Sequence, residues 1–229
     1  MDLNILYEDN HLVVVNKAHA QLVQGDQTGD PSLDHQIRDF LKMKYDKPGN
    51  VFLGVVHRLD RPASGVVVFA KTSKALTRMN QVFKDRTIKK IYWAIVEQVP
   101  TRPEATLVHF LKRNRKLNKS VAFDASRPGT REASLSYRLC GHSRHYYFLE
   151  IQLHTGRHHQ IRAQLAAIGC RIKGDLKYGA RRSNPGGGIS LHARKLEFIH
   201  PVRKENLAIT ADPPDEPIWK AFMEAAQPI

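Results

Sequence analysis

The chain has 229 residues, of which 41% are hydrophobic and 25% charged, so it can bury a substantial core as an ordinary globular protein. It has neither the run of about 18 apolar residues needed for a membrane-spanning helix nor the basic start and apolar stretch of a signal peptide, and we expect a cytoplasmic protein. A formal net charge of +14, without a basic amphipathic helix that would suit a membrane surface, favours nucleic acid as the partner.

In the first half of the chain, runs of β-branched residues alternate with two segments of helical periodicity. The runs predict strands, and clusters of polar residues with Gly or Pro predict the loops between them. The strands are expected at 4–17 (two strands around an acidic turn), 51–57, 65–71 and 89–99. One helix is expected to begin after Ser32, which suits an N-cap, and another at Thr72 or Ser73. Residues 58–64 then form a tight loop between two apolar strands.

The second half of the chain is dominated by predicted strands. They are expected near 104–110, 119–124, 132–140, 145–154, 190–199 and 206–210. Helices are expected at 158–168, ended by Gly169, and at 215–226. Strands outnumber helices and do not alternate regularly with them, which predicts an α+β fold with a large mixed, mostly antiparallel sheet flanked by helices. We find no repeat and no linker, so we expect one domain over 1–229, in which 181–189 is a flexible basic loop, either a substrate flap or a connector.

The segment from His57 to Arg61 places a carboxylate between two arginines on the short loop. Arg58 and Arg61 favour the ionised form of Asp60 and hold it in place. A fixed, ionised aspartate acts as a nucleophile or a general base. The alternative is an ordinary surface salt bridge, which is the commoner situation for an isolated Asp–Arg pair.

A second group of polar residues follows the predicted strand that ends near 154. A helix that begins at 158, with Arg157 beside its N-terminus, is suited to bind an anion. His158 and Arg162 are four residues apart and would share a helix face. His154, His158 and His159 together suggest a metal site, but the carboxylate ligand and the H-E-x-x-H spacing are missing, so no metal is expected. The alternative is a basic surface patch.

Two further segments have features of RNA-binding proteins. In a strand, Tyr92 and Trp93 point to opposite faces, so one would stack on a base while the other packs in the core, unless both are core aromatics. Five of the nine residues 111–119 are basic: Lys112, Arg113, Arg115, Lys116 and Lys119. At the tip between two strands they would contact an RNA backbone or form a solvated turn, and we weigh these equally.

The two cysteines, Cys140 and Cys170, lack the C-x-x-C spacing of a zinc site and do not form a disulfide framework. Buried, reduced thiols are expected.

Taken together, these segments resemble the RluA-type pseudouridine synthases. The stretches that carry the resemblance, in family order, are 7–10 with 14–17, 57–65 with 69–72, Lys90-x-Tyr92, 155–162, 174–179, 191–193 and 198–201. They run from about residue 3 to residue 201, and several motifs of this length in the same order make coincidence very improbable.

The resemblance implies a fold, a reaction and roles for five residues. Members of the family have the pseudouridine synthase fold. They cleave the N1–C1′ bond of a uridine in RNA, turn the base and rejoin it through C5, without a cofactor or metal. Asp60 matches the catalytic aspartate, and Arg58 matches a residue that fills the space left by the flipped nucleotide. Tyr92 matches the tyrosine that stacks on the target base. Arg162 matches the arginine paired with the catalytic carboxylate, and Arg157 is the alternative for that role or for a phosphate contact.

The sequence departs from the family pattern in two places. Ala63 stands where many members have Thr, which removes a hydroxyl from the loop but leaves the nucleophile. The motifs begin at residue 3, so we expect the small N-terminal S4-type domain of many members to be absent, and RNA contacts to come from 112–119 and 181–188. The expected partner is tRNA or rRNA, without membrane or metal, and the chain is expected to be a monomer.

Two other functions fit parts of the sequence. One is a non-catalytic RNA-binding module, against which the joint presence of Asp60, Tyr92 and Arg162 argues. The other is a metal-dependent phosphoesterase built on the three histidines, which a chelator would silence.

Overall fold

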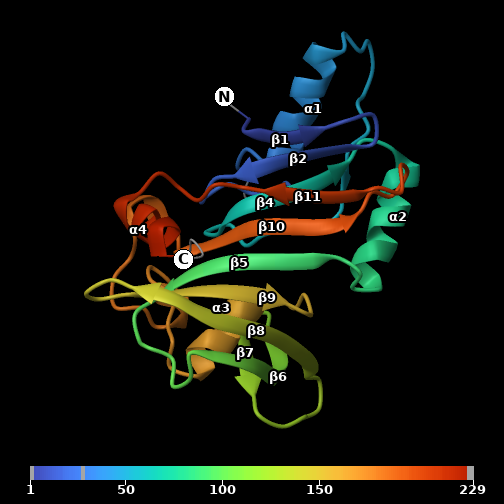
Figure 1. Ribbon diagram of the computed structural model, residues 1–229. Helices are drawn as coiled ribbons and strands as arrows, with labels where there is room; N and C mark the ends of the chain where they lie inside the picture. Colours follow the sequence, from blue (N-terminus) through green and yellow to red (C-terminus); the bar gives the residue numbers. More distant parts are fainter. Residues whose placement is uncertain (1–2, 27–28, 226–229) are drawn as a thin grey trace. The chain divides into compact units, whose positions relative to one another are not determined.

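The structure is a computed structural model that describes residues 3–26 and 29–225. The chain divides into two compact units, which we describe separately. The first unit comprises Met1–Ile88 and Ala193–Asp212, and the second comprises Lys89–His192 and Pro213–Ile229. In Figure 1 the first unit contains the blue and teal elements together with the orange and red strands β10 and β11.

The first unit contains a sheet with the strand order β1-β2-β4-β10. Outside this order, β11 pairs with β10 and β3 pairs with β4. Every pairing given by register here, β1 with β2, β2 with β4, β3 with β4 and β10 with β11, is antiparallel. Its strands are β1 (Ile5–Glu8), β2 (Leu12–Lys17), β3 (Gly54–Val55), β4 (Ser64–Ala70), β10 (Leu191–Ile199, in this unit from Ala193 onward) and β11 (Asn206–Thr210). Its helices are α1 (Leu33–Lys44) and α2 (Ser73–Lys84).

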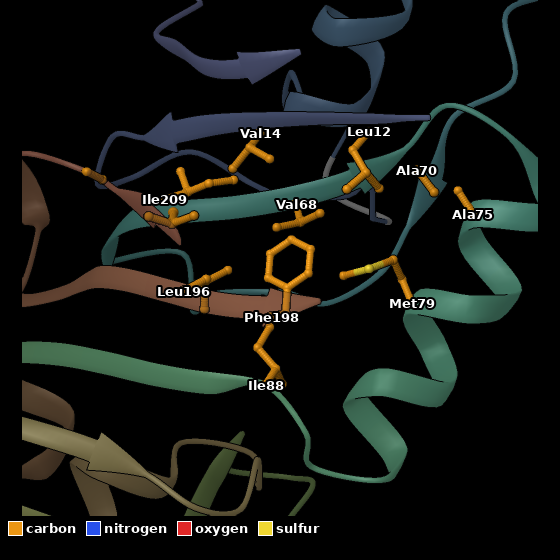
Figure 2. Packing of buried hydrophobic residues seen from close by; sticks show 12 residues of the cluster. Leu12, Val14, Val68, Ala70, Ala75, Met79, Ile88, Leu196, Phe198 and Ile209 are labelled. Carbon is orange, nitrogen blue, oxygen red and sulfur yellow. The ribbon is translucent and has the colours of Figure 1, made fainter. Parts of the chain in front are cut away.

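The central strands of the first unit are buried on both faces, which explains their unbroken apolar runs. All seven residues of β4 are buried. Because side chains alternate along a strand, Val67 and Phe69 pack toward α1. Val66 and Val68 pack on the other side, in the cluster that contains Met79 of α2. Figure 2 shows Met79, Val68 and Phe198 meeting in that cluster.

The second unit is a five-stranded sheet, antiparallel throughout, with the order β5-β9-β8-β6-β7. Its strands are β5 (Lys89–Val96), β6 (Glu104–Asn114), β7 (Lys119–Phe123), β8 (Arg131–His142) and β9 (Tyr147–Leu153). Its helices are α3 (Gln160–Ala167) and α4 (Pro217–Ala225), with single 3-10 turns at Leu176–Tyr178 and Pro185–Gly187.

The two helices of the second unit cover different sets of strand residues. Trp219 and Phe222 of α4 pack on Trp93, Ile95 and Phe148. Ala163 of α3 packs on Leu111, Ala133 and Tyr178. The sheet therefore has a core on each face.

The predicted α+β class with mostly antiparallel strands is confirmed, and most elements lie where the sequence predicts them. The helix starts are confirmed after Ser32 and Thr72, and Thr72 Oγ1 accepts the Ala75 N–H at 3.2 Å. Ser32 is the N-cap residue, but its hydroxyl donates to the Asp34 carboxylate and does not cap a helix N–H, so that part of the prediction is wrong. Gly169 follows α3 with a φ of +81°, as expected for a C′ glycine.

Four other expectations need correction. The strand predicted at 51–57 has only two residues, because β10 is also a neighbour of β4 and the His57 ring, not its backbone, accepts the Val68 N–H at 3.1 Å. The strand predicted at 89–99 ends at Val96. The helix predicted from 158 begins at Gln160, because His159 has a φ of +53° and so cannot be helical. Cys170 is buried, but Cys140 is only half-buried.

Within the described ranges, the structure contains no helix of the length and apolarity needed to span a bilayer.

Gly65, at the start of β4, provides a test of this packing. Its φ is +117°, and a Cβ at this position would overlap the backbone of Ala193 in the neighbouring strand β10. We expect Gly65→Ala to lower the free energy of unfolding by more than about 2 kcal/mol, measured by urea denaturation. Gly49→Ala is the matched control, since no atom lies within 4 Å of its added Cβ. Equal stability of the two variants would contradict the close approach of the strands.

Candidate functional site

The loop that carries Asp60 is short and closed by a backbone turn. The Ala63 N–H donates to the Asp60 carbonyl at 3.0 Å, and β4 begins at the next residue. Asp60 is half-buried on this loop, and Arg58 is exposed. Arg61 donates to the Ala20 carbonyl at 3.1 Å and forms an ion pair with Asp30 at 2.7 Å. Its side chain therefore ties the Asp60 loop to the segment that follows β2.

Lys17, at the end of β2, supports the same loop from inside the first unit. Its side chain is fully buried, and its Nζ donates to the carbonyls of Ala18, Gln21 and Arg61 at 2.9, 3.0 and 3.1 Å. These three acceptors match the three donors of an ammonium group. Burial lowers the pKa of Lys17 to about 7, while the negative charge of Asp60 acts to raise it. Lys17 is thus both bonded to the loop and electrostatically coupled to Asp60.

Lys17 lies in one of the segments that carry the family resemblance, but the resemblance implies no role for it. The available signal was its position, because Val13, Val15 and Lys17 share one face of a strand. A lysine on the same strand face as two buried valines is itself expected to be buried, and a buried amine needs hydrogen-bond acceptors.

His57 anchors the start of the loop. Besides accepting the Val68 N–H, its ring stacks on Phe83 of α2 with centroids 4.8 Å apart. The loop is therefore held at its start by His57 and near its middle by Lys17, with Asp60 between these two points.

In the second unit, Arg162 is a buried guanidinium with a fixed orientation. It forms a bidentate ion pair with Asp175, Nε to Oδ2 at 2.7 Å and Nη2 to Oδ1 at 2.8 Å, and both side chains are buried. The guanidinium also lies over the Tyr178 ring, with Cζ 5.0 Å from the centroid. Arg162, Asp175 and Tyr178 come from two of the segments that carry the family resemblance, and the fold brings these segments together.

Arg157 has different surroundings. It is half-buried, and its Nε donates to the Glu132 carbonyl at the start of β8, at 3.0 Å. Its backbone N–H donates to Gln160 Oε1 at 3.0 Å, and the Thr155 hydroxyl donates to the same oxygen at 2.7 Å. These bonds shape the turn before α3, so Arg157 lies at the surface edge of the motif and Arg162 in its interior.

The histidines before α3 tie the helix to the strands. His154 bonds to Ser136 at 2.7 Å, and His158 bonds to Ser120 at 3.0 Å and to Asn118 at 3.1 Å. The rings of His158 and His159 stack 3.8 Å apart. Because α3 begins at Gln160, His158 does not share a helix face with Arg162, and that prediction is wrong. Among the described residues, no group of three His, Cys, Asp or Glu side chains is arranged to hold a metal ion.

Both aromatic residues of β5 are buried, but they pack on different faces of the sheet. Trp93 packs on α4 and donates its Nε1–H to Glu150 at 3.2 Å, so it is a core aromatic. Tyr92 pairs with Ile151 of β9, which in turn pairs with Tyr137 of β8. Tyr92 therefore lies on the face opposite Trp93.

The basic run 111–119 forms the end of the β6–β7 hairpin, as the sequence predicts. Its turn closes where the Asn118 N–H donates to the Arg115 carbonyl at 3.2 Å. Four of its five basic side chains are exposed: Lys112, Arg113, Arg115 and Lys116. Lys119 is half-buried, with its Nζ 4.8 Å from the centroid of the Tyr178 ring.

The basic loop 181–189 is fixed near its middle. Asn184 is buried, accepts from Lys173 Nζ at 2.5 Å and donates to Ser190 Oγ at 3.0 Å. These bonds favour a connector over a substrate flap. The structure thus gathers Asp60, Arg58 and Lys17 in the first unit, and the remaining candidate residues in the second.

Lys17→Met tests the buried amine through the pH dependence of stability. The pKa of Lys17 is about 7 in the folded protein, against roughly 10.4 when unfolded. The unfolded chain therefore binds more protons between these values, and the stability of the wild type rises with pH. We expect the free energy of unfolding of the wild type, relative to that of the variant, to rise by about 2 kcal/mol between pH 7 and pH 9. Lys42→Met, at an exposed position of α1, is the control, and a difference that does not change with pH would refute the assignment.

Asp175→Asn tests the buried ion pair. The substitution keeps the shape but removes the charge that faces Arg162, and breaking a buried pair costs about 3 kcal/mol. Asp215→Asn is the matched control, because Asp215 pairs with Lys220 on the surface and such pairs contribute less than about 1 kcal/mol. Urea denaturation at pH 7 measures both, and losses of equal size would contradict a structural role for the pair.

Comparison with known proteins identifies the family of the chain. Residues 11–167 match the family model described as RNA pseudouridylate synthase. An uncharacterised RNA pseudouridine synthase of Synechocystis is 34% identical over 221 residues, which cover 93% of this chain and 66% of the relative. The ribosomal large subunit pseudouridine synthase D of Vibrio cholerae is 32% identical over 230 residues, 94% of this chain and 69% of the relative. The chain thus spans about two thirds of the length of these relatives.

A solved structure shares the fold. The human RNA pseudouridylate synthase domain containing 4 superposes with a TM-score of 0.78 at 24% identity, covering 97% of this chain and 92% of that one. The family model covers well over half of the chain, including the Asp60 loop and the start of α3. The chain therefore belongs to the RNA pseudouridylate synthase family.

Proposed function

We propose that the protein converts uridine in tRNA or rRNA to pseudouridine in the cytoplasm, with Asp60 as the catalytic carboxylate and without a cofactor. The observation that carries the proposal is the position of Asp60 on a closed turn. Lys17 bonds to the Arg61 carbonyl of this turn, and His57 fixes its start, in a chain that belongs to this family. A carboxylate that reacts at one atom of a nucleotide needs such a fixed position, because small misplacements are costly in rate. Relatives named for the large ribosomal subunit make rRNA the first pool to test.

The other candidate residues fit complementary roles. Arg162 is assigned to the arginine that pairs with the catalytic carboxylate because of its match to the family motif, and Asp175 fixes the orientation of its guanidinium. Arg157 is closer to the surface and suits a phosphate contact. Tyr92, on the sheet face away from α4, is assigned to stacking on the target base, and the exposed Arg58 to the space left by the flipped nucleotide.

RNA binding has to compensate for taking the uridine out of the stack. Flipping a base costs a few kcal/mol, and contacts with phosphate supply affinity that depends on salt. The exposed cations of the β6–β7 hairpin, Lys112, Arg113, Arg115 and Lys116, are the proposed source of these contacts, together with Lys119 at the base of the turn.

The test uses RNA that carries tritium at C5 of uridine, incubated with the protein in the presence of EDTA. Joining C5 to C1′ expels that hydrogen, so tritium release reports the reaction itself. We expect release by the wild type from rRNA or tRNA, tested separately, and a fall to background for Asp60→Asn. Asp215→Asn is the control and should keep full activity, because Asp215 is an exposed residue just before α4.

Three outcomes would contradict the proposal. Release that survives in Asp60→Asn would remove this residue from the chemistry. RNA binding without release from total cellular RNA would favour a non-catalytic module. An RNA-cleaving activity abolished by EDTA would favour the metal-dependent phosphoesterase.

A further inference from the structure

The tip of the β6–β7 hairpin presents an apolar side chain to solvent. Leu117 is 65% exposed, and it lies in the turn that joins the two strands, after Arg115 and Lys116. Its backbone N–H donates to Asn114 Oδ1 at 3.1 Å, so the turn has a defined conformation. Neither this bond nor the turn requires a leucine side chain at the position, and exposing it to water is unfavourable.

The surroundings of Leu117 limit what it would bind. The residues 111–120 include five cations and no acidic side chain. An acidic protein surface would bind the cations, and a neutral, apolar one would bind the leucine. A ligand that binds both has to combine negative charge with apolar faces. RNA has this combination, because phosphates line the strand and every base has a flat π face.

The hairpin is bonded to the rest of the second unit close to its tip. The Ser120 N–H donates to the Tyr178 hydroxyl at 2.9 Å, and Ser120 Oγ donates to the His158 carbonyl at 2.7 Å. Asn118, beside Leu117, bonds to His158 through its side chain and accepts from Lys177 Nζ through its carbonyl at 3.3 Å. A side chain that enters a base stack has to be on a rigid loop, since a mobile loop would move before the bases separate.

We propose that Leu117 is an apolar wedge that packs against unstacked bases, so that the hairpin favours RNA with a loop or bulge over continuous duplex. The inference rests on RNA as the ligand in the proposed function. An A-form duplex offers phosphates to the cations but hides its base faces in the stack, and its major groove is too narrow for side chains to read. Apolar side chains that enter base steps are an established means of holding distorted nucleic acid. The cations therefore bind both kinds of RNA, whereas Leu117 contacts only RNA with unstacked bases.

The experiment measures binding, not turnover, with two RNA probes of equal nucleotide number: a stem-loop with a uridine-containing loop, and a blunt, fully paired duplex. We expect Leu117→Ala to weaken binding to the stem-loop by about 10-fold, as expected for the loss of most of a leucine contact. Binding to the duplex and the slope of log K against log salt should not change. Lys116→Ala should weaken binding to both probes and reduce the slope by about 1.

Val99→Ala is the matched control, because Val99 is 55% exposed in the same unit but lies outside the hairpin, and it should bind both probes as the wild type does. Stem-loop binding unchanged in Leu117→Ala would overturn the wedge and favour a contact with another protein. An equal loss on both probes would also overturn it, since it would indicate a disturbed hairpin. Because the assay needs no catalysis, an effect of Leu117→Ala without tritium release by the wild type would keep the wedge and reject the proposed reaction.

Discussion

A buried lysine has to be given acceptors for its donors, and this requirement organises the first unit around the Asp60 loop. Lys17 continues the strand that places Val13 and Val15 in the core, so its amine cannot reach water. Its acceptors are backbone carbonyls of the segment that follows β2 and of the Asp60 loop, where the acceptor is Arg61, next to Asp60. The strand that carries the lysine is itself fixed by a core on each face. A constraint set by the interior of the unit is therefore transmitted to the position of one carboxylate.

The second unit fixes its own charged group by a different arrangement. There the buried charge is a guanidinium, and its counter-charge is the side chain of Asp175 and not a backbone oxygen. Tyr178, three residues later, accepts the Ser120 N–H and donates to the Ser120 carbonyl, which attaches the hairpin to the same segment. Arg162 and the basic hairpin thus share one support. A substitution of Asp175 or Tyr178 is therefore expected to affect both Arg162 and the hairpin. A change in RNA affinity is easier to interpret at Leu117, whose side chain takes no part in these hydrogen bonds.

The sequence predicts the parts of this molecule that depend on neighbouring residues. Unbroken β-branched runs located β4, Thr72 identified the start of α2, and Gly169 the end of α3. The errors occur where a distant residue decides. His159 leaves the helical region because Gln160 folds back onto Thr155 and Arg157, and the strand predicted at 51–57 is short because another strand neighbours β4. Asp175 as the partner of Arg162 was likewise not evident from spacing, since the two lie on separate segments.

The charge of the chain and its few exposed contact groups contribute to RNA recognition in different ways. Net positive charge attracts any RNA, because the gain from releasing counterions is the same for every sequence. It cannot by itself select one uridine among many. Selection has to come from groups that respond to the bases, and these groups must have a fixed conformation, or binding energy is lost in ordering them. The hydrogen bonds that hold the histidines of the α3 motif against Ser120 and Asn118 provide such support. A motif whose residue types first suggest metal chemistry is then better explained as the structural base of the basic β6–β7 hairpin.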